Sequence, residues 1–137
     1  REMIPGRLQL LPGVSSWLSG LQDRGIPQAV ASSAPQENIE AVVDALHIRH
    51  YFAALVSAYF MPGKPDPAVF LEAARQLGVD PAGCVVIEDA VPGVAAAKGA
   101  GMVCIAVTTT HPRRNLSGAD LVVDRLADLD VGAVFPD

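Results

Sequence analysis

The sequence predicts an α/β protein in which a parallel sheet carries helices on both faces. Short apolar runs typical of buried strands alternate with runs of helical period through most of the 137 residues. Aromatic residues make up only 5% of the chain, so Ala, Val and Leu supply the apolar bulk, which suits helices packed on a parallel sheet. Polar loops follow several of the strand-like runs, and the carboxyl ends of parallel strands share one edge of a sheet.

The expected elements follow from these patterns in chain order. The predicted helices have apolar residues at helical spacing and cover residues 14–24, 36–46, 68–77 and 91–100. The predicted strands are short apolar runs at residues 26–31, 53–57, 84–87, 102–107 and 121–123. Residues beyond 123 are expected to form a helical turn or a tail, and Trp17 is expected to lie in the core.

Composition limits the class of protein. Half of the chain is hydrophobic and its length fits one domain with a modest core. The formal net charge of -5 argues against nucleic-acid binding. No apolar run reaches the length of a membrane span and no signal peptide is visible, so we expect a cytoplasmic protein. Cys84 and Cys104 are then expected to be buried, reduced thiols.

Two adjacent carboxylates mark the end of the strand at 84–87. Glu88 and Asp89 stand where the apolar run stops, and a helix with Pro92 in its first turn follows. Acidic oxygens at the carboxyl end of a parallel strand suit Mg²⁺ better than zinc. The alternative is structural: Asp89 caps the helix and Glu88 is solvated.

Two further polar loops carry candidate binding groups. Ser32 and Ser33 end the strand at 26–31, where hydroxyls and backbone N–H groups can hold a phosphate; the alternative is an ordinary helix start. Lys64 lies in the proline-rich loop 61–67, whose stiffness would aim its ammonium group; the alternative is an ordinary loop lysine.

If the sheet is parallel, these three loops meet at one edge. A hydroxyl, an ammonium and paired acids are the groups needed to bind a phosphoryl group and its Mg²⁺. The predicted ligand therefore carries a phosphoryl group. His47 and His50, three residues apart, are expected to be surface or helix-end histidines, because no further metal-ligand cluster surrounds them.

These residues resemble motifs of the haloacid dehalogenase superfamily, in particular its β-phosphoglucomutase-like phosphatase branch. The resemblance runs from about residue 11 to the end. Three stretches carry it: Val30-Ala31-Ser32-Ser33, Gly63-Lys64-Pro65-Asp66-Pro67-Ala68-Val69-Phe70 and Val86-Ile87-Glu88-Asp89-Ala90-Val91-Pro92-Gly93-Val94.

The resemblance implies a Rossmann-like core and a role for each candidate residue. Ser32, with Ser33, would hydrogen-bond the transferring phosphoryl group. Lys64 would neutralise that group and steady the nucleophile. Asp89, with Glu88, would hold Mg²⁺.

The sequence departs from the family pattern before Ser32. Family members begin with a central strand ending in Asp-x-Asp, and its first Asp is the nucleophile. No such motif precedes Ser32, and Asp23 lies in a helical pattern. We therefore expect residues 1–12 to be a remnant of a cap or linker and residues 13–137 to be a partial core without its first, central strand. Such a chain would be the truncated, carboxyl-terminal part of a longer hydrolase, without normal turnover by itself.

Two alternatives stay open beside the phosphatase. A sugar phosphomutase on the same fold is one, although Ala34 and Pro35 offer no side-chain hydrogen bond to a second phosphate. A non-enzymatic binding or assembly module is the other, and the missing nucleophile favours it. Without the central strand, the strands before Ser32 and Glu88 must expose edges or pair with each other, which favours a homodimer through exposed sheet edges.

Overall fold

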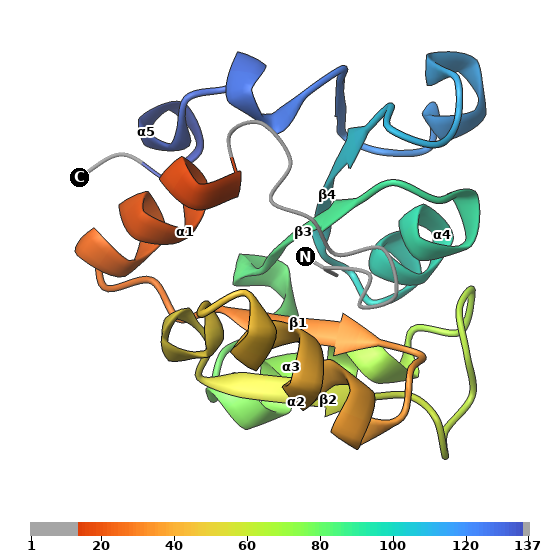
Figure 1. Ribbon diagram of the computed structural model, residues 1–137. Coiled ribbons are helices and arrows are strands. Elements are labelled where there is room, and N and C mark those ends of the chain that lie inside the picture. The colour runs from red at the N-terminus through yellow and green to blue at the C-terminus, as the bar shows by residue number, and fades with distance from the viewer. Residues whose placement is uncertain (1–13, 136–137) are drawn as a thin grey trace.

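The computed structural model describes residues 14–135 and confirms the α/β class (Figure 1). The helices are α1 (Val14–Asp23), α2 (Gln36–Ala45), α3 (Ala68–Leu77), α4 (Val91–Gly99) and α5 (Val131–Val134). The strands are β1 (Ala29–Ser32), β2 (Ala54–Ser57), β3 (Val85–Glu88), β4 (Val103–Val107) and β5 (Leu121–Val123). Short 3₁₀ helices connect them: η2 (Arg49–Tyr51), η3 (Pro81–Gly83), η4 (Arg113–Leu116) and η5 (Leu126–Asp128). The predicted lead at residues 1–12 lies outside the described residues.

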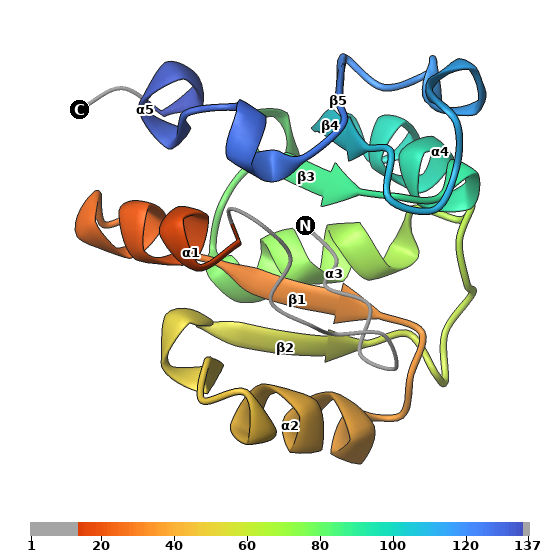
Figure 2. The same ribbon diagram turned by 45° about the horizontal axis from the view of Figure 1, so that its top comes forward.

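The described strands form two small parallel sheets rather than one. β1 pairs with β2 in one sheet, and the other has the order β3-β4-β5. Figure 2 shows β1, β2 and β3 pointing the same way, so their carboxyl ends lie on one side of the molecule. Among residues 14–135, β1 and β3 do not pair with each other. Of the two outcomes expected without a central strand, the structure shows unpaired edges.

Two hydrophobic clusters hold the two sheets together. The first contains Ala31 of β1 and Val86 of β3 together with buried residues of α3 and α4. The second contains Val30 and Ile87, the neighbours of those residues along each strand, together with buried residues of α1 and α2. Because neighbouring strand residues point to opposite faces, both sheets share the same two faces. Helices therefore cover both sides, as predicted.

An apolar cavity of about 220 Å³ is lined by residues of both sheets. Its walls include Ala31 from β1, Ile87 from β3, Trp17 from α1 and Phe70 from α3. Among the described residues, the two sheets therefore lack a shared ladder and are also separated by this cavity.

Strand boundaries differ from the prediction most at β1, and by one residue at β2, β3 and β4. β1 begins at Ala29 and not at residue 26. Pro27 has no N–H to give to a ladder, and the Gln28 side chain instead donates to the Leu18 carbonyl at 3.0 Å. β3 extends one residue further than predicted, so that Glu88 is its last residue and pairs with Ala106.

Trp17 is buried, as predicted, and fixes the end of the chain. It is 4% exposed, and its indole N–H donates to the carbonyls of Leu126 at 3.2 Å and Leu129 at 2.9 Å. The residues after β5 therefore pack against α1 as short helical turns instead of trailing away. None of the helices in the described part of the chain is long and apolar enough to cross a membrane.

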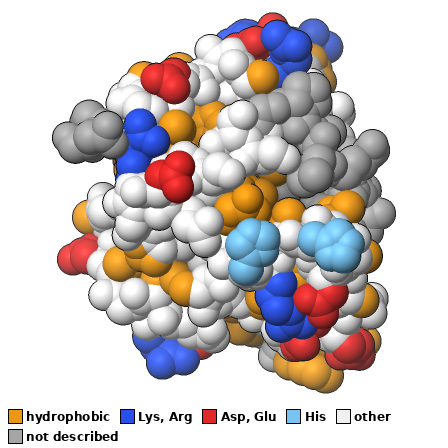
Figure 3. Space-filling model, turned by 60° about the vertical axis from the view of Figure 1, so that its left-hand side comes forward, with side chains coloured by type: hydrophobic (Ala, Val, Ile, Leu, Met, Phe, Trp, Pro, Cys, Tyr) orange, Lys and Arg blue, Asp and Glu red, His pale blue; other side chains and the backbone are white. Residues whose placement is uncertain are grey.

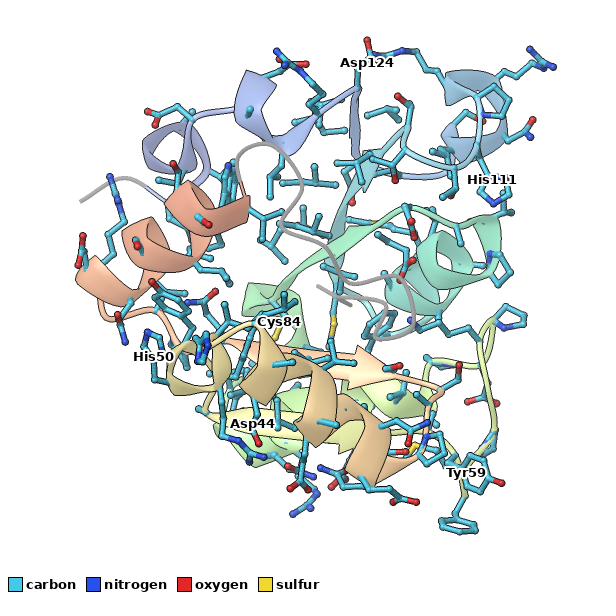
Figure 4. All side chains as sticks on the ribbon, viewed as in Figure 1. Asp44, His50, Tyr59, Cys84, His111 and Asp124 are labelled. Atoms are coloured by element: carbon cyan, nitrogen blue, oxygen red, sulfur yellow. The ribbon has the colours of Figure 1, made fainter. Side chains whose placement is uncertain are left out.

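The two cysteines are free, but only one fits the prediction of buried thiols. Cys104 is buried in β4, and burial raises the pKa of its thiol to about 12. Cys84, at the start of β3 (Figure 4), is only half-buried, so the prediction is wrong for it. Burial also raises the pKa of the Cys84 thiol.

Asp120 connects the loop before β5 to β4. Its Oδ2 accepts from Lys98 Nζ at 2.7 Å and from the backbone N–H of Cys104 at 2.8 Å. Hydrogen bonding from Lys98, followed by the backbone N–H of Cys104, lowers the pKa of Asp120 below its ordinary value of 3.8.

We expect Asp120→Asn to lower the melting temperature at neutral pH. A lowered folded-state pKa contributes stability above the unfolded-state value and loses it as pH falls through the folded-state value. Because the side chain is 43% exposed, the loss should stay below about 1 kcal/mol. Thermal melts of both proteins across pH should converge below pH 3.8. A difference that stays constant down to the lowest pH would contradict a role for the charge.

Candidate functional site

The loop after β2 and the end of β3 meet through a buried ion pair. Lys64 Nζ donates to Glu88 Oε2 at 3.2 Å, and the two side chains are only 12% and 0% exposed. The Lys64 ammonium also lies 4.8 Å from the centroid of the Phe70 ring, at the start of α3. The proline-rich loop thus places Lys64 beside the acidic pair. Lys64 and Glu88 lie close together, as predicted.

Glu88 is held against the first turn of α4. Its Oε1 accepts from the backbone N–H groups of Asp89 at 3.0 Å and Ala90 at 3.3 Å. Gly93 makes room for it: a Cβ at residue 93 would lie 2.0 Å from Glu88 Cδ. Glu88 is therefore buried. The alternative in which Glu88 is solvated is wrong.

Asp89 is 3% exposed and is bound by the loop that follows β4. Thr109 Oγ1 donates to Asp89 Oδ2 at 3.3 Å, and Thr110 Oγ1 donates to the Asp89 carbonyl oxygen at 2.9 Å. The sequence pattern did not lead us to assign these threonines a role. Their position in the sequence could have indicated one, because hydroxyls directly after a parallel strand lie on the same edge of the sheet as the acids.

The hydroxyl of Ser32 is engaged within its own loop. Ser32 is 2% exposed at the end of β1, and its Oγ accepts from the Ala34 N–H at 3.2 Å. Ser57, at the end of β2, donates to the Ala34 carbonyl and fixes the same loop. Ser33 is exposed. The loop after β1 lies on the same side of the molecule as the loops after β2 and β3 (Figure 2), and the hydrogen bond described for Ser32 stays within its own loop.

The paired acids suit a magnesium ion better than a transition metal. Glu88 and Asp89 offer only carboxylate oxygens, and Mg²⁺ is commonly held by one or two carboxylates, with water and substrate phosphate as its other ligands. No group of three or more His, Cys, Asp or Glu placed to hold a metal ion occurs among the described residues. The donor set therefore fits Mg²⁺, and the two acids would supply part of its coordination.

Two of the three histidines, His47 and His50, are surface residues that follow α2. His47 and His50 are exposed, as predicted, and His50 contacts the Tyr51 ring with 4.1 Å between centroids. Figure 3 shows histidine side chains on the surface beside acidic and basic groups, where Arg49 forms ion pairs with Glu40 and Asp44. Arg113 and Arg114 are likewise exposed, as expected of surface charge.

Comparison with known proteins agrees with the fold and the motifs. The family described as haloacid dehalogenase-like hydrolase matches residues 1–101. A bifunctional riboflavin kinase/FMN phosphatase of Arabidopsis thaliana is 40% identical over 127 residues, covering 90% of this chain and 33% of the relative. A beta-phosphoglucomutase of Bacillus subtilis is 41% identical over 121 residues, covering 88% of this chain and 51% of the relative.

The crystal structure of a β-phosphoglucomutase from Clostridium difficile matches with a TM-score of 0.82 at 30% identity, covering 96% of this chain and 56% of that chain. The chain thus spans between a third and about half of the length of these curated relatives. The match over residues 1–101 and the Rossmann-like fold agree, and the chain belongs to the haloacid dehalogenase-like hydrolase family.

Proposed function

We propose that this chain provides the phosphate- and metal-binding side chains of a Mg²⁺-dependent phosphatase that acts on a small phosphorylated metabolite. The reaction is hydrolysis of a phosphoric monoester, in which water replaces the alcohol on phosphorus and inorganic phosphate leaves. The FMN phosphatase activity in a relative's name supports the reaction class.

The buried Lys64–Glu88 pair is the observation that carries this proposal. An ammonium and a carboxylate withdrawn from water are costly, and they persist at places where their charge is used or well compensated. Here the ammonium lies at the carboxyl edge of the strands, 3.2 Å from the acidic pair. In this position Lys64 would neutralise the negative charge of a phosphoryl group.

Each remaining site residue has a proposed part. Asp89, together with Glu88, would hold Mg²⁺, which when bound would polarise the phosphoryl oxygens. Ser32 and Ser33 would donate hydrogen bonds to phosphate oxygens from the end of β1. For Ser32 this requires its hydroxyl proton, which stays available because its Oγ accepts from Ala34.

Thermal melts with inorganic phosphate and Mg²⁺ test the binding site. We expect the two ligands to raise the melting temperature of the chain, because a ligand that binds only the folded state stabilises it. The double variant Lys64→Met/Glu88→Gln removes both charges of the buried pair at once and should lose the response to phosphate.

The matched control is Lys98→Met/Asp120→Asn, which removes a lysine–aspartate pair joined at 2.7 Å. Lys98 lies in the last turn of α4, whereas the two acids precede the first turn of that helix. It should melt lower but keep the full shift with phosphate. An equal phosphate shift in the Lys64→Met/Glu88→Gln protein would overturn the proposed role of the buried pair.

The 137-residue chain by itself is expected to show no turnover, because no Asp-x-Asp motif precedes Ser32. The assay is release of nitrophenol from an aryl phosphate in the presence of Mg²⁺. Mg²⁺-dependent hydrolysis that disappears in Asp89→Asn would refute this expectation and would show that the chain carries its own nucleophile.

A sugar phosphomutase is the second candidate, supported by the beta-phosphoglucomutase relative and by the matched crystal structure. A mutase must hold a second phosphate, and the loop after Ser32 offers Ala34 and Pro35, which are half-buried and have no hydrogen-bonding side-chain atoms. This loop therefore favours the phosphatase.

A further inference from the structure

Three consecutive threonines follow β4, and their hydroxyls have two different destinations. Thr109 and Thr110 both donate to Asp89, one to the carboxylate and one to the backbone carbonyl. Thr108 turns away and donates to Asp124 Oδ1 at 2.9 Å, near the top of the view in Figure 4. Two neighbouring hydroxyls that bond the same aspartate indicate a specific contact with Asp89 and not only a polar end to the strand.

We propose that Thr109 and Thr110 are positioning residues that hold Asp89 in the orientation required to bind Mg²⁺. This inference rests on the proposed function, because it assigns the support of the same metal site. Thr109 fixes the rotation of the carboxylate through Oδ2, and Thr110 fixes the backbone from which that side chain projects.

The local structure explains why Asp89 needs this support. Asp89 lies between the end of β3 and Val91, the first residue of α4, and Ala90 between them has an extended backbone with φ -126° and ψ 146°. Neither ladder nor helix hydrogen bonds fix a side chain at such a junction. The carboxylate of its neighbour Glu88 is held by Lys64 and two backbone N–H groups. The two threonines, which follow the neighbouring strand β4, bond the carboxylate and the backbone carbonyl of Asp89.

Hydrogen bonds to the outer side of a metal ligand are energetically important. They select one orientation of the carboxylate before the ion arrives, so that binding does not have to order it. Loss of such a partner typically weakens metal affinity about tenfold or more. Thr109 and Thr110 are exposed, so their hydroxyls contribute little to the core.

Titration calorimetry of the whole chain with Mn²⁺, an oxygen-preferring stand-in for Mg²⁺, tests the inference. Thr109→Val keeps the shape of the side chain and removes the donor, and it should weaken Mn²⁺ binding about tenfold. Thr109→Ser keeps the hydroxyl and should bind like the parent. Thr108→Val is the matched control, because it removes a hydroxyl from the same loop that points at Asp124, and it should also bind like the parent.

The outcomes separate this inference from the function on which it rests. If the parent and Thr109→Val bind Mn²⁺ equally, the positioning role is wrong and the metal site stands. If the parent binds no Mn²⁺, both the metal site and its support are wrong. If Thr109→Val and Thr108→Val weaken binding equally, the effect belongs to the loop as a whole and the specific role of Thr109 is overturned. Thermal melts without metal should be alike for all the variants, whereas a purely structural role would lower them.

Discussion

Lys64→Met is expected to destabilise the protein by about 3 to 5 kcal/mol, the usual cost of leaving one member of a buried ion pair without its partner. Glu88 is fully buried and would keep its backbone donors but lose the ammonium at 3.2 Å. The contact of the ammonium with the Phe70 ring would be lost as well. Urea unfolding of the two proteins, followed by tryptophan fluorescence, measures the difference directly.

A second substitution shows whether the charge is responsible. Glu88→Gln in the Lys64→Met background removes the negative charge of Glu88 while keeping the shape of the side chain. We expect the double variant to recover more than half of the lost free energy of unfolding, giving a large coupling in the double-mutant cycle. Additive effects of the two substitutions would show that Lys64 stabilises the fold through its packing and not through the pair.

Gly93→Ala is expected to cost about 3 kcal/mol, although alanine is the better helix former by about 1 kcal/mol. The added Cβ would lie 2.0 Å from Glu88 Cδ, closer than any real contact. Glu88 cannot swing aside without breaking its hydrogen bonds to Lys64, Asp89 and Ala90. Calorimetry should show a fall in melting temperature on the order of 10 °C.

Gly83→Ala is the matched control, because nothing lies within 4 Å of a Cβ at that residue and its φ is not positive. It should leave the melting temperature almost unchanged. The clash itself is tested by adding Gly93→Ala to Glu88→Ala, where the obstructing carboxylate is gone. If Gly93→Ala costs as much in that background as in the parent, contact with Glu88 is not the reason for the loss.

Much of this architecture follows from local pattern. Apolar residues at helical spacing give α2 and α3, and short apolar runs give β2 and β5, almost to the residue, because propensity and burial agree there. The meeting of Lys64 with Glu88 was also predictable, since parallel strands place their following loops on one edge.

Other features depend on contacts that no local pattern carries. The burial of Glu88 requires both the space left by Gly93 and the ammonium of Lys64, which is 24 residues away in the sequence. The support of Asp89 by Thr109 crosses 20 residues from another strand. The side-chain amide of Gln28 donates to the Leu18 carbonyl on α1. Each of these contacts joins groups that are distant in the sequence, and no local sequence pattern predicts it.

The division into two sheets has a consequence for how the molecule opens. Side chains of the two shared clusters join β1–β2 to β3–β4–β5, and in the described residues no backbone ladder does so. Because side-chain contacts alone join the two sheets in this part of the chain, we expect each sheet to open as its own cooperative segment. Amide hydrogen exchange would then give two protection levels, with the three-stranded half exchanging more slowly than the two-stranded half.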